Sequence, residues 1–284
     1  MKNLSIDGNK LNYIEFNSDK SQTLLFLHGN SHSHKSFFKQ FHSEALKNYR
    51  LLFVDLPGHG DSSKNGNYSL TNAAQLIQQM IEVLDLKDII LVGHSMGGHV
   101  AINLLKYHHP RGLVVFGTPP LKNPFDPSAF LANPNIAALG QQQSTLKEIE
   151  AFMLEMNYKA EEMKLGVEDY LKTDPAFRTD IFGDIINGVN ENEIVLINSF
   201  KGQVMFLLAT TDSMINNKYI RNEFYCNPKN VLVEIEAGHS PHIEASETFN
   251  KLLSGFSEKV FNENLEKNIL YNGLQHESSY EQRN

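Results

Sequence analysis

The sequence predicts an α/β fold with a mostly parallel, doubly wound sheet of eight strands and an inserted helical segment. Two observations support this prediction. Short apolar runs alternate with segments of helical periodicity five times in succession, which is typical of a parallel sheet covered by helices. Strand signals then disappear between residues 119 and 202, before two further apolar runs resume the sheet. A chain of 284 residues is long enough for one sizeable core with such an insertion.

The composition is that of an ordinary globular protein, with 41% hydrophobic and 20% charged residues. The net charge of −8 and the lack of any basic run make nucleic acids and anionic membrane surfaces poor partners. The single cysteine, Cys226, excludes an intrachain disulfide and fits a reducing compartment. The N-terminus lacks the apolar stretch of a signal peptide, and no apolar run approaches membrane-spanning length. We therefore expect a cytoplasmic protein that does not insert into membranes.

Eight strands are predicted by hydrophobic patterning. The first two flank the turn former Asp7-Gly8-Asn9, which indicates a β-hairpin. Most of the others are continuous apolar runs, such as Thr23-Leu24-Leu25-Phe26-Leu27, and runs of this kind suit strands buried on both faces. The predicted strands cover residues 4–6, 11–16, 23–27, 51–55, 89–92, 112–117, 203–210 and 231–235.

Helices are predicted where apolar residues recur at intervals of three or four. One such pattern runs from Ala74 to Leu84 and follows Ser69 and Thr71, either of which can cap a helix. The predicted helices cover residues 37–49, 71–84, a segment after 95, 144–156, 163–171, 179–199, 219–224 and a final segment around 249–256.

Residues 119–202 predict a helical cap over the carboxyl ends of the strands. Five prolines between 119 and 134 break the regular alternation, and polar helical segments follow them. Ordinary crossover helices are the alternative, but one crossover requires far fewer residues. We therefore divide the chain into an α/β core, 1–118 and 203–260, a helical cap, 119–202, and a polar tail, 261–284. The tail is rich in Asn, Glu and Gln, which predicts a short helix or disorder.

The stretch Gly93-His94-Ser95-Met96-Gly97 lies between a predicted strand and a predicted helix. To lift one serine hydroxyl to the top of a sheet, the chain must turn from strand to helix within a few residues. This turn forces the serine into a strained backbone conformation, and the residues two positions on either side come too close for side chains. Glycines at those two positions, together with the strand and the helix, indicate a nucleophile at Ser95.

This stretch, extended to Gly98, resembles the nucleophile elbow of the α/β-hydrolase superfamily. The resemblance spans residues 10–260 and includes His28-Gly29, the loop from Asp55 to Gly60, and Gly238-His239. It implies the α/β-hydrolase fold and a capped, esterase-like serine hydrolase. The cap is where such an enzyme selects its substrate, and no substrate-defining motif is recognised there.

A serine hydroxyl needs a base in contact with it and a third group that orients the base. His239 is the predicted base, because it follows the last strand and the preceding Gly238 leaves space around its imidazole. Asp212, at the end of the strand before, is the predicted orienting acid. A surface histidine and a turn aspartate are the alternatives at these positions. The chain order Ser95, Asp212, His239 favours catalysis, since it is the order expected for this fold.

The oxyanion formed by attack on a carbonyl requires two aimed backbone N–H donors. One is predicted to be the amide of Met96, at a helix N-terminus, where free donors and the dipole favour negative charge. His28-Gly29-Asn30 resembles the family's His-Gly-x motif, in which x supplies the second donor. Asn30 is therefore the second candidate, and Ser31 is the fallback. The motif also resembles the haloalkane dehalogenases, but those enzymes attack with an aspartate at the elbow, and position 95 is serine.

Other polar residues near the strand ends are given no catalytic role. Asp55 and Asp126 are the nearest rivals to Asp212, and Asp55 is interpreted as structural because its loop resembles a structural motif of the family. Four histidines near the first strand ends are an alternative metal site, but no pair has the His-Glu-x-x-His arrangement or an obvious carboxylate partner. These four are His28, His32, His34 and His42. We therefore predict no metal and no cofactor.

These positions predict a cytoplasmic serine hydrolase that cleaves small or medium carboxylic esters, or lactones or thioesters, through an acyl-enzyme. Its partner is a small-molecule substrate, and the oligomeric state is left open. An acyltransferase would share the acyl-enzyme but deliver it to an alcohol or amine. A carbon–carbon bond hydrolase is less favoured, because those families typically have Gly-Asn-Ser where this chain has Gly93-His94-Ser95. A ligand-binding signalling module on the same fold is the third alternative.

Overall fold

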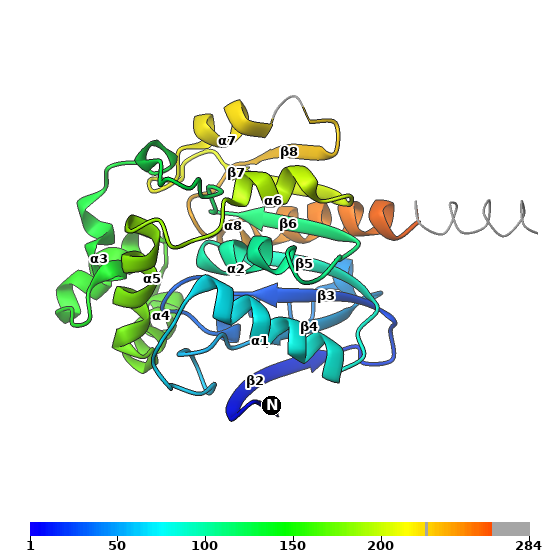
Figure 1. Cartoon of the computed structure of the whole chain (residues 1–284), viewed down its shortest axis with the longest axis horizontal. Coiled ribbons are helices and arrows are strands. Elements are labelled where there is room, and N and C mark those ends of the chain that lie inside the picture. The colour runs from blue at the N-terminus through cyan, green and yellow to red at the C-terminus, as the bar shows by residue number, and fades with distance from the viewer. Residues whose placement is uncertain (225–226, 263–284) are drawn as a thin grey trace, which may run out of the picture.

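The computed structural model describes residues 1–224 and 227–262 of the chain (Figure 1). Within these residues, eight strands form one sheet in the order β1-β2-β4-β3-β5-β6-β7-β8. β2 pairs antiparallel with β1 and β4, and the other neighbours run parallel. The predicted fold class is therefore confirmed. The strands are β1 (Lys2–Ile6), β2 (Asn9–Phe16), β3 (Gln22–Leu27), β4 (Arg50–Val54), β5 (Asp88–His94), β6 (Gly112–Phe116), β7 (Gln203–Ala209) and β8 (Asn230–Ile235).

The central strands are buried on both faces, as their continuous apolar runs predicted. Along β3, Leu25 and Leu27 join the core on one face of the sheet, while Leu24 and Phe26 join the core on the other. Helices α1 and α2 cover the first face, and residues 246–262, which are helical, cover the second. The labelled α-helices are α1 (Leu70–Val83), α2 (Met96–Leu104), α3 (Leu146–Glu155), α4 (Ala160–Lys172), α5 (Pro175–Ile186), α6 (Glu193–Ser199), α7 (Asn217–Phe224) and α8 (Pro241–Glu244).

The segment between β3 and β4 differs from the helix predicted over 37–49. It contains two 3-10 helices, His34–Phe37 and Glu44–Leu46, in place of an α-helix. Phe37 and Leu46 are still buried in the core. The Gln40 side chain donates to the backbone oxygen of His242 over 2.8 Å, so a distant loop helps to hold this segment. Burial of apolar side chains alone therefore produced the helix-like spacing.

The long insertion between β6 and β7 is helical, and its helices divide into two groups. α3, α4 and α5 lie together on the side toward which the arrow of β3 points (Figure 1). α6 instead packs against α2, so it belongs to the helix layer on the sheet although it falls within the range 119–202 predicted for the cap. A buried carboxylate explains this placement. Glu193 of α6 accepts hydrogen bonds from Nδ1 of His99 and Nδ2 of Asn103, both on α2 and both over 2.8 Å.

The described residues end at 262, so the predicted polar tail, 261–284, lies almost entirely outside them. Its first residue, Phe261, is buried against the core on the second face of the sheet. Within the described residues, no helix combines the length and the apolar character that a membrane crossing requires.

Candidate active site

Ser95 lies at the turn between β5 and α2, in a strained conformation of the kind that the Gly-x-Ser-x-Gly spacing predicts. Its backbone angles are φ 51° and ψ −122°, which are unusual for a residue with a side chain. A Cβ at position 93 would lie 2.5 Å from Cα of Gly98, and a Cβ at position 97 would lie 2.1 Å from the backbone oxygen of Leu27. Because both distances are far below van der Waals contact, only glycine fits at positions 93 and 97.

Two hydrogen bonds anchor the backbone of Ser95 to the end of β6. Its N–H donates to the backbone oxygen of Phe116 over 2.9 Å, and the hydroxyl of Thr118 donates to the Ser95 backbone oxygen over 2.9 Å. Met96 follows as the first residue of α2, where an N–H has no acceptor within the helix and the dipole favours negative charge. The turn therefore places a serine hydroxyl beside a donor suited to an anion.

His239 and Asp212 come from the loops after β8 and β7 and meet in the interior. Nδ1 of His239 lies 2.8 Å from Oδ2 of Asp212, and both side chains are almost fully buried. Because a carboxylate can only accept, Nδ1 carries the proton, and Nε2 of the neutral imidazole is an acceptor. This is the tautomer that a general base for a serine requires.

The second oxygen of the Asp212 carboxylate is held by backbone donors. Oδ1 accepts from the N–H of Met214 over 2.9 Å and from the N–H of Ile215 over 3.2 Å. Burial alone would raise the pKa of Asp212, but the charge of His239, its hydrogen bond and the two backbone amides lower that pKa below its usual value. Asp212 is therefore a carboxylate at neutral pH and can stabilise an imidazolium.

The space around the His239 imidazole comes from Gly117, and not from Gly238 as the sequence suggested. A Cβ at position 117 would lie 2.8 Å from Cε1 of His239. A Cβ at position 238 would instead approach the carboxylate of Glu244, at 3.1 Å. Glu244 accepts hydrogen bonds from the N–H of Gly238 over 2.8 Å and from the N–H of Ser240 over 3.0 Å, one on each side of His239.

Three residues that determine the position of His239 were not predicted from the sequence. Gly117 and Glu244 are two of them, and His94 is the third, because its Nε2 donates to the backbone oxygen of His239 over 2.9 Å. Two signals were available: a glycine directly after a buried strand, and a carboxylate shortly after the predicted base. Neither signal identifies its partner, since the contacts join segments that are distant in sequence.

The two predicted oxyanion donors, Asn30 and Met96, line one cavity together with Ser95. Neither backbone N–H donates to a protein acceptor within the described residues. The fallback donor, Ser31, is already engaged, because its N–H donates to Nε2 of His59 over 3.1 Å. The geometry therefore leaves Asn30 as the better donor of the two after β3.

The rival acids make other contacts. Asp55 accepts from the N–H of His34 over 2.8 Å, and its pKa lies well below the usual range because hydrogen bonding and charge interaction with His34 outweigh its burial. Asp126 accepts from the hydroxyl of Ser128 over 2.6 Å and caps a short 3-10 helix. Both carboxylates therefore shape loops. Among the described residues, no group of three or more His, Cys, Asp or Glu side chains is arranged to hold a metal ion.

The cavity beside Ser95 has a volume of about 290 Å³. Its wall is mostly apolar and combines residues at the strand ends with residues from the insertion. The insertion contributes Leu139 and, from α5, Ile181, Phe182 and Ile185. This volume lies near the lower limit for small-molecule pockets, so the cavity suits a small apolar group.

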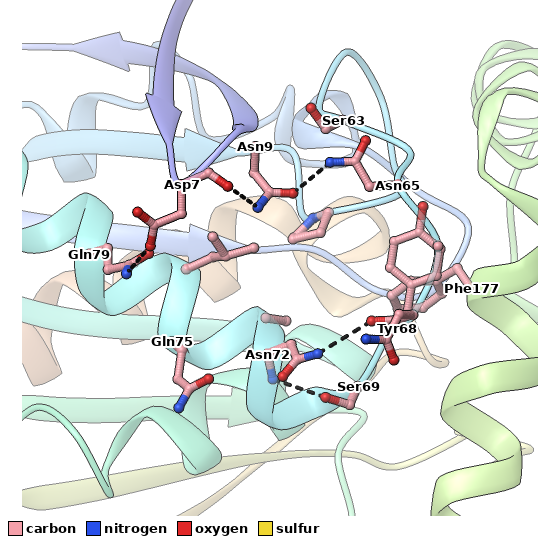
Figure 2. Close-up of a pocket in the computed structure, with 15 residues that line it drawn as sticks. Asp7, Asn9, Ser63, Asn65, Tyr68, Ser69, Asn72, Gln75, Gln79 and Phe177 are labelled. Carbon is pink, nitrogen blue, oxygen red and sulfur yellow. Dashed lines mark hydrogen bonds between the residues drawn. The ribbon is translucent and has the colours of Figure 1, made fainter.

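A second pocket, of about 420 Å³, lies beside α1 (Figure 2). Its wall carries many amide and hydroxyl groups, and none of the predicted site residues lines it. Polar side chains of the wall bond one another: the amide of Asn65 donates to the amide oxygen of Asn9 over 2.9 Å, and the amide of Gln79 donates to the carboxylate of Asp7 over 2.7 Å. Because several of its polar groups are already paired with one another, we assign the pocket no role.

Comparison with known proteins identifies the family. A model of the alpha/beta hydrolase family matches residues 24–252. Among curated proteins, the uncharacterized hydrolase YugF of Bacillus subtilis is 33% identical over 105 residues, which cover 36% of this chain and 38% of that protein. The chain thus matches about a third of the length of its curated relatives.

Solved structures show the same fold over nearly the whole chain. An N-acyl homoserine lactonase superposes with a TM-score of 0.82 at 23% identity, covering 91% of this chain and 96% of that one. An esterase from Thermogutta terrifontis superposes with a TM-score of 0.75 at 18% identity, covering 92% and 99%. Since the family model spans the elbow and the loops that carry Asp212 and His239, the chain belongs to the alpha/beta hydrolase family, as the resemblance implied.

Proposed function

We propose that this protein is a serine hydrolase that cleaves esters of small or medium carboxylic acids through an acyl-enzyme at Ser95. The observation that carries the proposal is the buried pair of His239 and Asp212, 2.8 Å apart, beside a cavity that Ser95 and His239 both line. A buried carboxylate that fixes the tautomer of a histidine next to a strained serine is the arrangement that nucleophilic catalysis requires.

In this mechanism Nε2 of His239 takes the proton of the Ser95 hydroxyl as its oxygen attacks the substrate carbonyl. The Asp212 carboxylate stabilises the imidazolium that forms. The backbone N–H groups of Met96 and Asn30 donate to the oxyanion. His239 then passes its proton to the leaving group, and water attacks the acyl-enzyme with His239 again acting as base.

The cavity supports a small or medium acyl group. Its volume is about 290 Å³, and its wall is mostly apolar, so it favours an alkyl or aryl group over a charged one. Lactones and thioesters offer the same carbonyl chemistry and belong to the proposed substrate class. The reaction requires no cofactor, and we place the protein in the cytoplasm with a small molecule as its partner.

Three other functions on the same fold would give different results in solution. An acyltransferase would transfer the acyl group to an added alcohol or amine in preference to water. A carbon–carbon bond hydrolase would cleave a diketone in preference to an ester. A signalling module would bind one ligand tightly, with turnover near zero across a broad ester panel.

The test is a series of p-nitrophenyl esters with acyl chains of two to twelve carbons. We expect kcat/KM to be highest for a short or medium chain and to fall for the longest ones. Ser95→Ala should reduce kcat by at least about 10⁴-fold. Undiminished turnover by this variant would overturn the proposal.

A further inference from the structure

A small recess adjoins the apolar cavity and shares Ser95, His239 and Leu139 with it. It has a volume of about 10 Å³ and is lined by Ser95, His239, His32 and Gly29, together with apolar side chains of the insertion such as Phe152. About this much space is needed to hold one water molecule. The recess is therefore large enough for a water beside the nucleophile and the predicted base, and too small for a substrate group.

One nitrogen of His32 has a defined partner. Nδ1 lies 2.7 Å from the backbone oxygen of Asn30, and because a carbonyl oxygen can only accept, Nδ1 must donate. This bond fixes the tautomer, so Nε2 carries a lone pair and no proton. Burial also lowers the pKa of His32 to about 3, which keeps the ring neutral near pH 7.

The other nitrogen is a buried acceptor that lacks a donor. His32 is 1% exposed, and its Nε2 makes no hydrogen bond within the described residues. The neighbouring rings do not donate to it. The centre of the His94 ring lies 6.3 Å away, but its Nε2 donates to the backbone oxygen of His239, so its other nitrogen is an acceptor. The centre of the Tyr158 ring lies 5.7 Å away, and its hydroxyl also makes no hydrogen bond in the described part of the chain. Phe152, with its centre at 6.3 Å, has no polar atom. A buried acceptor of this kind is normally paired with ordered water or with a ligand.

We propose that His32 positions the water that hydrolyses the acyl-enzyme, and this role rests on the proposed function. The water occupies the recess, donates one O–H to Nε2 of His32 and the other to Nε2 of His239. Its oxygen bonds to the acyl carbon while His239 takes the second proton. The tetrahedral intermediate then breaks the bond to Ser95 Oγ, which recovers that proton from His239, and the free acid leaves. His32 accepts a hydrogen bond throughout and neither gains nor loses a proton.

This role distinguishes water from other molecules that could take the acyl group from Ser95. Water has two O–H groups and can engage both histidines, whereas methanol has one and can engage only His239. His32 therefore favours hydrolysis over transfer of the acyl group to an alcohol. Removing its lone pair should slow attack by water without slowing attack by methanol to the same degree.

The experiment compares the wild type with His32→Leu, His32→Phe and His32→Gln on p-nitrophenyl butyrate. Leu and Phe remove the acceptor, whereas Gln returns an oxygen near the position of Nε2. His109→Leu is the matched control, because His109 is an exposed histidine. Rapid mixing measures the first release of p-nitrophenol, which reports acylation. Product analysis in 1 M methanol gives the ratio of methyl butyrate to butyrate, which reports the competition for the acyl-enzyme.

We expect the acylation rate of the Leu and Phe variants to stay within about threefold of the wild type. Their ratio of methyl ester to acid should rise at least about tenfold, while the Gln and His109→Leu variants stay within about threefold of the wild-type ratio. Melting temperatures show which of the two apolar variants is folded and suitable for comparison.

An unchanged ratio in a folded Leu or Phe variant would overturn the role of His32 and leave the proposed function intact. Parallel loss of acylation and hydrolysis with an unchanged ratio would likewise overturn it, because His32 would then act only by supporting Asn30. If the wild type releases no p-nitrophenol, or releases it as fast with Ser95→Ala, the proposed function itself fails.

Discussion

Gly117 faces the imidazole of His239 so closely that a Cβ at position 117 would lie 2.8 Å from the ring carbon Cε1. Its backbone has φ +59°, a conformation that glycine adopts readily and other residues rarely adopt. The end of β6 therefore serves two purposes. It anchors the backbone of Ser95 through Phe116, and it leaves room for the imidazole proposed to act on that serine.

Gly117→Ala should displace the imidazole of His239 and reduce kcat by about 100-fold, since small misplacements of a catalytic group have effects of this size. The variant should also lose stability, because alanine is strained at this φ. Assays with p-nitrophenyl butyrate and thermal unfolding measure both effects. Gly255→Ala is the control: a Cβ there meets nothing within 4 Å, so its activity should not change. Full activity in Gly117→Ala would mean that the imidazole does not need its observed position.

Asp212→Asn should reduce kcat by about 10⁴-fold, because an amide favours the wrong tautomer of His239. The measurement is steady-state turnover together with thermal unfolding, which establishes that the variant is folded. Asp126→Asn is the matched control, and it should lose little activity because its carboxylate bonds Ser128. If Asp212→Asn loses less than tenfold, another acid must orient the base.

Asp169 should make stability depend on pH. Burial raises the pKa of its carboxyl to about 6, although the hydroxyl of Ser33 donates to it over 2.6 Å. Because the folded protein holds this proton more tightly than the unfolded chain, whose pKa is about 3.9, the contribution of Asp169 is most favourable below about pH 4. That contribution is lost as the pH rises through about 6.

Asp169→Asn removes this titration while keeping an acceptor for Ser33. The variant should match the wild type in urea unfolding at pH 4. At pH 7.5 it should be more stable by up to roughly 3 kcal/mol, which corresponds to a shift of about two pKa units. A difference in unfolding free energy that is the same at both pH values would contradict the assignment.

Glu193 should contribute far more to the free energy of unfolding than its neighbour Glu191. Glu193 is fully buried and accepts from the side chains of His99 and Asn103 and from the N–H of Leu121. Glu193→Ala leaves these donors unpaired and should cost about 3–5 kcal/mol in urea unfolding. Glu191→Ala breaks only a partly exposed ion pair with Lys106 and should cost less than about 1 kcal/mol. Equal losses would show that the buried contacts do not hold α6 to α2.

The sheet and the elbow were predictable because both follow local rules. The run at 24–27 is apolar without interruption, which suits a short strand buried on both faces. The glycines at 93 and 97 are required by close contacts with Gly98 and with Leu27. The contact of position 93 lies within the turn, whereas that of position 97 is made with β3. Both were predictable because the Gly-x-Ser-x-Gly spacing is the known requirement of this strand-to-helix turn.

The surroundings of His239 were not predictable, since they depend on contacts between distant segments. Gly238 seemed to make room for the imidazole because it is adjacent in sequence, yet its neighbour is Glu244, and Gly117 makes the room. Helix α6 was assigned to the cap because its contact with α2 is likewise a contact between distant segments. Its periodicity shows an apolar face but does not show which surface that face meets.

The most direct test of the central claim is the site of covalent modification by a fluorophosphonate, found by peptide mapping with mass spectrometry. We predict one adduct per chain, located on Ser95, with labelling lost in Ser95→Ala and strongly slowed in His239→Ala. An adduct on another residue, or labelling of Ser95→Ala at the wild-type rate, would contradict the claim that Ser95 is the nucleophile.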